Sequence, residues 1–137
     1  MSSVFLLDTN VFSEALRPQP RHRILQKITR HEYEIAIASV VWHELRYGLE
    51  RLPPSLRRVS GERYLNEIAT TMPMLNYDRA AAEWHARERA RLTARGLTPP
   101  ILDGQIAAIA AVNGLTVVTF NTAHFNRFEG LRVENWA

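Results

Sequence analysis

Short apolar runs alternate with stretches of helical periodicity along the whole of this 137-residue chain. The runs have the length and composition of buried strands, whereas the stretches between them repeat apolar residues at helical spacing. We predict strands over Val4–Leu7, Ile35–Ala38, Pro73–Asn76, Leu115–Thr119 and Leu131–Glu134. Strands that alternate with helices form a parallel sheet that helices cover on both faces. The expected fold class is therefore α/β, with three layers.

The helices between these runs are bounded by capping residues, prolines and glycines. Ser39 and Asp78 are suitable N-caps, and Gly96 is a suitable end for the helix that begins after Asp78. We predict helices over Asn10–Leu16, Arg23–His31, Ser39 to about Arg51, Leu56–Met72, Asp78 to Gly96, and from Asp103 to Asn113. No repeat or linker interrupts this order, so residues 1–137 are expected to form a single domain.

The composition narrows the class of protein. The absence of cysteine rules out disulfides and thiolate zinc sites and suits a reducing cytoplasm, which is the expected location. The N-terminus has no basic segment followed by a long apolar stretch, so no signal peptide is expected. The longest apolar runs, around Ile35–Trp42 and Ile106–Val112, are far shorter than the roughly 20 residues that cross a bilayer. We expect no association with a membrane.

The basic residues are almost all arginine. The formal net charge is +3, and Lys27 is the single lysine among 17 basic residues. Arginine suits bidentate contact with phosphate or carboxylate, which indicates a nucleic acid or an acidic protein as partner. A genome rich in G and C, which favours arginine codons, explains the same bias equally well.

Asp8 lies where the first apolar run meets a helix, and it is one of only three aspartates in the chain. A carboxylate at the C-terminal end of a buried parallel strand points into the crevice where such sheets bind ligands. Holding it there is costly unless a metal ion, another cation or hydrogen bonds offset the charge. The commonest role of an aspartate before a helix is as its N-cap. Metal-assisted chemistry is the functional hypothesis.

Two further acids lie on apolar helix faces. The neighbours of Glu44 at three and four residues carry no charge, and Asp103 lies on the apolar stripe of its own helix. Structural roles are available to both, since Glu44 could pair with Arg46 or Arg51 and Asp103 could be an N-cap. If Asp8, Glu44 and Asp103 converge at one edge of the sheet, they repel one another and call for a cation.

Oxygen ligands of this kind favour Mg²⁺, or Mn²⁺ as its substitute, over zinc. Such a site clamps phosphate oxygens and activates water. The three acids thus predict metal-dependent phosphoryl chemistry.

Four segments resemble, in order, the four motifs of PIN-domain ribonucleases: Leu6–Val11, Ser39–Gly48, Asp103–Ala108 and Val117–Thr122. The length of the chain and its closing segment, Gly130–Trp136, are similar to those of VapC-type toxins of type II toxin–antitoxin systems. The resemblance covers the whole chain. It implies a PIN-like, Rossmann-like sheet with strand order 3-2-1-4-5.

The resemblance also implies roles for the acids. Asp8 and Asp103 would be the main metal ligands, and Glu44 would bind the metal directly or through water, or position the nucleophile. Together they would be the catalytic residues of a metal-dependent endoribonuclease that hydrolyses RNA phosphodiester bonds with metal-activated water.

Four residues near the acids would support them. Thr9 and Asn10 follow Asp8 in the first motif, and Thr119 would form a hydrogen bond with Asp8 or its water shell. Asn121 stands where the family commonly has a fourth acid, which leaves open whether one metal or two would bind. His124 stands where some relatives carry an acid before Phe125, and we interpret it as a loop histidine.

The resemblance further implies an RNA substrate, with loops of tRNA and rRNA both candidates, and a protein antitoxin that blocks the site. A homodimer is expected. Arg87, Arg91 and Arg95 recur every four residues and form either an RNA-binding stripe or a solvated face, partly paired through Glu83 and Arg87. Trp42 and His43 lie beside Glu44, where they could line a groove for a partner peptide. For Trp42, a place in the core or in a dimer contact is an equal alternative.

The principal alternative is a PIN-like module that binds RNA or a regulator but cleaves little or not at all. Asn121 favours this alternative because an amide offers an oxygen but no charge.

Overall fold

The central sheet is parallel throughout and has five strands in the order β3-β2-β1-β4-β5. The computed structural model describes residues 2–137. The strands are β1 (Phe5–Leu7), β2 (Ile35–Ala38), β3 (Met74–Leu75), β4 (Thr116–Val118) and β5 (Val133–Glu134). The predicted α/β class and strand order are confirmed.

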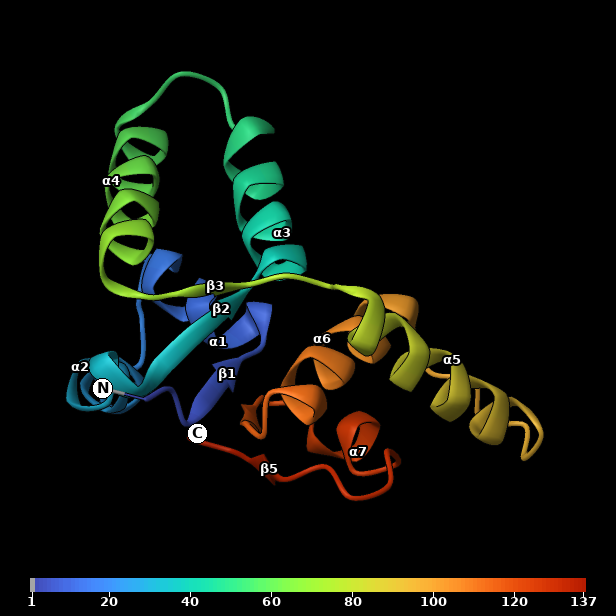
Figure 1. The fold of residues 1–137 in the computed structure, drawn as a ribbon. Helices are drawn as coiled ribbons and strands as arrows, with labels where there is room; N and C mark the ends of the chain where they lie inside the picture. The colour runs from blue at the N-terminus through green and yellow to red at the C-terminus, as the bar shows by residue number, and fades with distance from the viewer. Residues whose placement is uncertain (1) are drawn as a thin grey trace.

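The strands are flanked by helices, as Figure 1 shows. These are α1 (Thr9–Ser13), α2 (His22–Arg30), α3 (Ser39–Glu50), α4 (Leu56–Thr71), α5 (Arg79–Thr93), α6 (Ile101–Val112) and α7 (Thr122–Phe125), with 3-10 helices η1 (Glu14–Leu16) and η2 (Glu32–Glu34). Helices α3 and α4 pack side by side as an arm that rises from the sheet, and α5 packs on α6. Helix α3 also contacts α1 and α6.

The three central strands are buried on both faces because nearly every residue in them is apolar. All residues of β1, β2 and β4 are buried. The pairing of Leu7 with Val118 aligns the ends of β1 and β4. The residues that follow these two strands therefore emerge side by side at the carboxyl edge of the sheet.

Two predicted N-caps were wrong. Ser39 is the first residue of α3 and Ala38 occupies the cap position, because β2 passes directly into the helix without a turn. Helix α6 begins at Ile101, with Pro100 at the cap, so Asp103 lies inside the first turn and is not an N-cap. Asp78 does cap α5, by accepting a hydrogen bond from the Ala81 amide at 2.9 Å.

Two other helical features departed from the prediction. The helix after Asp8 tightens into η1 at Glu14, and the short α7 was not predicted. None of the helices within residues 2–137 has both the length and the apolar character needed to cross a membrane.

Candidate metal centre

Asp8 and Thr119 meet at the carboxyl edge of the sheet, as the alignment of β1 and β4 requires. The Asp8 amide donates to the Val118 carbonyl at 2.8 Å, which continues the pairing of the two strands by one residue. The Thr119 hydroxyl then donates to Asp8 Oδ2 at 2.8 Å. The expected hydrogen bond between these two side chains, 111 residues apart in sequence, is therefore present.

Asp8 is also the N-cap of α1, since its Oδ1 accepts a hydrogen bond from the Thr9 amide at 2.7 Å. The residue is only 7% exposed. Burial raises the pKa of the Asp8 carboxyl above its ordinary value; the hydrogen bonds from Thr119 and Thr9 oppose that shift, and the charge of Asp103 adds to it. The structural interpretation of Asp8 as an N-cap is confirmed, and the hydrogen bonds do not fully offset the effect of burial on the carboxyl.

Asp103 reaches the same edge from α6. Its Oδ2 lies 3.2 Å from Nδ1 of His124, on α7, and the same nitrogen lies 3.2 Å from Nδ2 of Asn121. The Asn121 amide in turn donates to the Thr119 hydroxyl at 2.9 Å. A continuous chain of polar contacts therefore joins Asp8 to Asp103 through the loop after β4.

Two buried oxygens lie directly beyond Asp8. Thr9 Oγ1 and Asn10 Oδ1 are inaccessible to solvent and have no hydrogen-bond partner among residues 2–137. Buried polar atoms without a partner usually contact a bound ion or an ordered water. Both residues directly follow Asp8 in the chain, which is consistent with the supporting roles expected for them.

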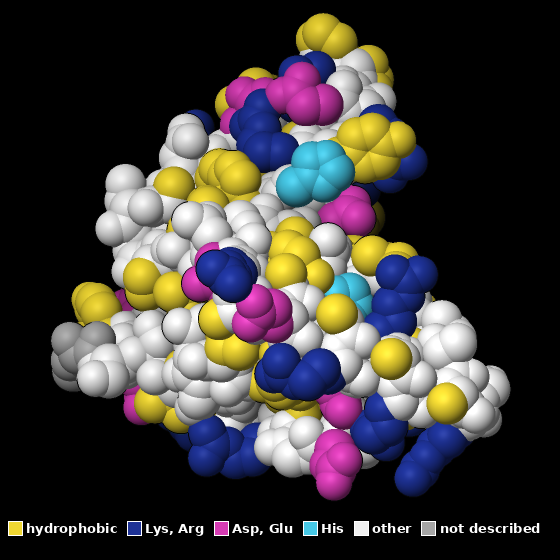
Figure 2. Space-filling model, turned by 45° about the vertical axis from the view of Figure 1, so that its right-hand side comes forward, with side chains coloured by type: hydrophobic (Ala, Val, Ile, Leu, Met, Phe, Trp, Pro, Cys, Tyr) yellow, Lys and Arg dark blue, Asp and Glu magenta, His cyan; other side chains and the backbone are white. Residues whose placement is uncertain are grey.

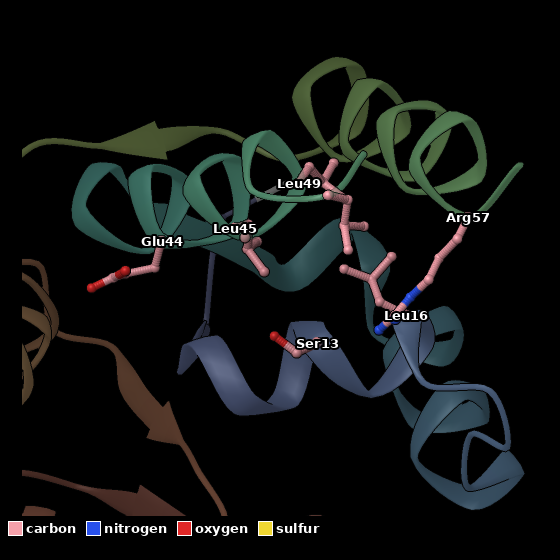
Figure 3. A pocket seen from close by; sticks show the side chains of 8 residues that line it. Ser13, Leu16, Glu44, Leu45, Leu49 and Arg57 are labelled. Atoms are coloured by element: carbon pink, nitrogen blue, oxygen red, sulfur yellow. The ribbon is translucent and has the colours of Figure 1, made fainter. Parts of the chain in front are cut away.

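Glu44 is the expected acid that the structure does not join to the others. It is half-buried on α3 and lines a pocket of about 140 Å³ between α3 and the α1–η1 segment. In Figure 3 its carboxylate lies at the opposite end of this pocket from Leu49 and Arg57 and points away from both. The proposed pairing with Arg46 or Arg51 is wrong, since Arg46 pairs with Glu50 and no ion pair of Glu44 occurs within residues 2–137.

The donor set suits a hard cation that retains water. Within the described chain, residues 2–137, no three His, Asp or Glu side chains are close enough together to enclose a metal ion. Mg²⁺ does not need such a cage, because it is usually bound through one or two carboxylates and keeps several waters. Asp8 and Asp103 provide two carboxylates whose mutual repulsion a divalent cation would relieve.

The comparison with known protein families fits this geometry. The PIN domain family matches residues 5–131. The chain belongs to the PIN domain family. The resemblance of its four motifs to those of PIN-domain ribonucleases is confirmed.

Individual PIN-domain relatives match over nearly the full length. The tRNA(fMet)-specific endonuclease VapC of Shigella flexneri is 32% identical over 133 residues, which span 97% of this chain and 98% of that protein. The crystal structure of FitAcB from Neisseria gonorrhoeae contains a chain that superposes with a TM-score of 0.88 at 31% identity, covering 97% of this chain and 98% of that one. VapBC-5 of Mycobacterium tuberculosis, a member of the VapBC family of toxin–antitoxin systems, superposes with a TM-score of 0.68 at 30% identity, covering 98% and 96%.

His124 is the residue of the candidate site to which the sequence analysis assigned no functional role. It was interpreted as a loop histidine, yet it lies on α7 within hydrogen-bond distance of Asp103. The nearby Asn121, predicted from the fourth motif, was the available sequence signal, because a residue three positions later in a short helix lies on the same side.

Of the three arginines that recur along α5, Arg87, Arg91 and Arg95, the second is paired with an acid. Arg91 forms two hydrogen bonds with Glu88, at 2.8 and 2.9 Å, and donates to the Arg127 carbonyl at 2.9 Å. Arg91 therefore ties α5 to the loop after α7. The predicted pairing of Glu83 with Arg87 is wrong, because Glu83 pairs with Arg79 at 3.0 Å.

Proposed function

We propose that this PIN-domain protein is a metal-dependent endoribonuclease of the VapC toxin type, with Asp8, Asp103 and Glu44 as its catalytic residues. The observation that carries the proposal is the buried Asp8 carboxylate, held by Thr119 and within electrostatic reach of Asp103. Asp8 and Asp103 would hold the cation, with Mg²⁺ the natural occupant and Mn²⁺ its substitute. A bound divalent cation would share the charge that develops on phosphate and lower the pKa of water.

The side chains of the site would hold the acids in place and provide the negative charge that binds the cation. The hydroxyl of Thr119 fixes one oxygen of Asp8, which leaves the carboxylate a single orientation toward the edge of the sheet. His124 contacts Asp103 directly, and Asn121 contacts His124 in turn. Glu44, on α3, is the third of the proposed catalytic acids. We assign it to orienting the attacking water, because it has no ion pair with another described residue.

RNA is the substrate class that the relatives indicate. One of them is named as specific for tRNA(fMet), so a loop of transfer RNA is our first candidate substrate, ahead of ribosomal RNA. The partner would be an antitoxin protein, as in the toxin–antitoxin assemblies among the structural relatives. We further propose that the protein acts as a homodimer in the cytoplasm.

Cleavage of purified RNA, with Mg²⁺ or with EDTA, tests the activity. The parent protein should cut only with Mg²⁺, and Asp8→Asn should reduce the rate by at least about 100-fold, on the order of losing a large electrostatic contribution. Asp78→Asn is the matched control, because Asp78 caps α5 and touches none of the proposed site. Equal cleavage by all three proteins would identify a contaminating nuclease and overturn the proposal.

Two observations support a second candidate, a PIN-like module that binds RNA or a regulator with little cleavage. Asn121 occupies the position of a fourth acid, and Glu44 does not join Asp8 and Asp103 in one cluster. This alternative predicts RNA binding without Mg²⁺-dependent cleavage, and no arrest of growth when the protein is expressed without its partner. Growth arrest that Asp8→Asn abolishes would exclude it.

A further inference from the structure

We infer that the outer face of α3 carries a platform on which a single-stranded RNA base stacks, formed by His43, Tyr47 and Arg51. We call these three residues the α3 ladder. The inference rests on the proposed action on RNA and adds the contact that would hold the substrate beside the acids.

The α3 ladder consists of three flat groups in series. The rings of His43 and Tyr47 are nearly parallel, with an interplanar angle of 17° and centroids 6.3 Å apart. The Arg51 guanidinium carbon lies 4.9 Å from the centroid of the Tyr47 ring. Residues four apart share one side of a helix, so this sequence spacing alone places the three groups in line.

The ladder faces solvent, although stacked aromatic groups of this kind are usually buried. Tyr47 is 51% exposed, and His43 and Arg51 are also exposed. Arg51 forms no ion pair with any residue from 2 to 137, whereas Arg46, on the flank of the ladder, is neutralised by Glu50. The ladder therefore offers solvent-exposed aromatic surface together with a positive charge that no described acid neutralises.

The position of the ladder links it to the proposed site. Glu44 and Gly48, each one residue further along α3, line the pocket between α3 and the α1–η1 segment. Helix α3 begins at Ser39, directly after β2, so the His43 end of the ladder lies nearer the carboxyl edge of the sheet. Figure 2 shows this side of the molecule, with a histidine beside a large hydrophobic side chain on the arm and a hollow next to them.

A nucleobase fits these features better than a peptide. Every nucleobase has a flat π-face, so stacking on aromatic rings does not depend on the RNA sequence. Arginine adds a cation–π contribution. Unpaired bases in RNA loops are recognised in this way, by stacking on Tyr, His and guanidinium planes. A polyanionic backbone also complements Arg51 and the net charge of +3.

The test compares a ten-nucleotide oligoadenylate with an oligomer of equal length that has abasic riboses at its central positions. Binding is measured by fluorescence anisotropy in EDTA, where no cleavage occurs. The parent protein should bind the base-bearing oligomer more tightly, and Tyr47→Leu should weaken that binding roughly tenfold or more. The same substitution should leave binding of the abasic oligomer unchanged, and Tyr47→Phe should restore the preference for bases.

Tyr33→Leu is the matched control, because Tyr33 is 65% exposed and lies on η2 rather than α3. It should bind both oligomers as the parent does. Arg51→Met should in addition reduce the salt dependence of binding, which Tyr47→Leu should not, because only the former removes a charge.

Three results would overturn the inference: no preference of the parent for the base-bearing oligomer, equal losses by Tyr47→Leu on both oligomers, or a change in molecular mass on Tyr47→Leu in light scattering. The last would make the ladder a contact between copies of the chain. Mg²⁺-dependent cleavage by the parent, measured on the same preparation, separates the two claims. Mg²⁺-dependent cleavage without a preference for bases would reject the stacking platform and support the nuclease activity. A preference for bases without cleavage would support the platform and reject the nuclease activity.

Discussion

Asp8 has one observed role, as a helix cap, and one proposed role, as a ligand of a cation. It caps α1 through the Thr9 amide, as an aspartate before a helix commonly does. Its second oxygen nevertheless accepts only the Thr119 hydroxyl, and burial still raises the pKa of the carboxyl. The remaining cost of the charge is the physical reason to expect a cation, because a cap alone would have lowered the pKa of this group.

Replacing Thr119 with valine tests how the site is held. The Thr119→Val protein loses the hydrogen bond to Asp8 and leaves the Asn121 amide without its acceptor. Its free energy of unfolding should fall by roughly 1–3 kcal/mol, as expected for unsatisfied buried groups. Urea denaturation of Thr116→Val provides the control, because Thr116 is also buried in this segment but forms no side-chain hydrogen bond with residues 2–137. Equal losses in both variants would contradict this account of Thr119.

Glu14 gives the fold a defined pH dependence. Its carboxylate is almost inaccessible to solvent and accepts hydrogen bonds from the Arg21 backbone, at 2.8 Å, and side chain, at 3.0 Å. These bonds lower the pKa of Glu14 to about 2 from 4.5. Because the unfolded chain binds the proton more readily, this stabilisation is full above pH 4.5 and declines as the pH falls toward 2.

The Glu14→Gln variant should therefore be less stable than the parent at pH 7, and the difference should narrow as the solution is acidified below pH 4.5. Denaturant titrations at a series of pH values measure both free energies. A difference that stays constant down to the acid limit would show that the charge of Glu14 is not what stabilises the parent.

At the scale of elements, the contact between α5 and α6 depends on a glycine. A side-chain carbon at Gly104 would overlap the imidazole of His85, which is buried against it. The other ring nitrogen of His85, Nδ1, lies 2.8 Å from the Tyr77 hydroxyl, while Nε2 has no partner among the described residues. Burial lowers the pKa of His85 below its ordinary value, and the charge of Arg89 adds to that shift.

Gly104→Ala should destabilise the protein by about 1–3 kcal/mol, because the added methyl forces α5 and α6 apart. In a protein that already carries His85→Ala, which removes the overlapping ring, Gly104→Ala should lower the free energy of unfolding much less. Gly48→Ala serves as the control, since its added carbon would meet nothing within 4 Å. Additive losses for Gly104→Ala and His85→Ala in thermal melting would show that the two positions are not in contact.

The elements that the sequence predicts best are those whose pattern is local. Strand β2 was predicted with its observed bounds, because an apolar run buried on both faces needs no tertiary information. The start of α6 was misplaced because Pro100 and Asp103 are both acceptable near a helix N-terminus, and packing rather than local chemistry selects between them. Helix α7 has only four residues, which is too few to show periodicity.

The candidate site was predictable only where strand pairing determines it. The contact of Asp8 with Thr119 follows from parallel strands that end together. The contact of His124 with Asp103 depends on how α7 folds back toward α6, which no residue pattern encodes locally. The fit of His85 against Gly104 escaped prediction for the same reason.

At the scale of the whole molecule, the positive charge is distributed rather than gathered in one stripe. Arg91 forms an ion pair with Glu88, and Arg58 forms ion pairs with Glu50 and Glu62. Arg51 on α3 remains without an acidic partner in the part of the chain described. Arg87 and Arg95 on α5 likewise form no ion pair among residues 2–137, so unpaired positive charge lies on both the arm and α5.

The central claim is that Asp8 and Asp103 together bind a divalent cation in the folded protein. Melting curves recorded during a titration with Mg²⁺ test it without reference to activity, because a ligand that binds only the folded state raises the melting temperature. The parent and Asp78→Asn should both melt at a higher temperature in millimolar Mg²⁺. Asp8→Asn should be at least as stable as the parent without metal and should not respond to Mg²⁺. A parent curve that Mg²⁺ leaves unmoved, or an equal rise for Asp8→Asn, would contradict the claim.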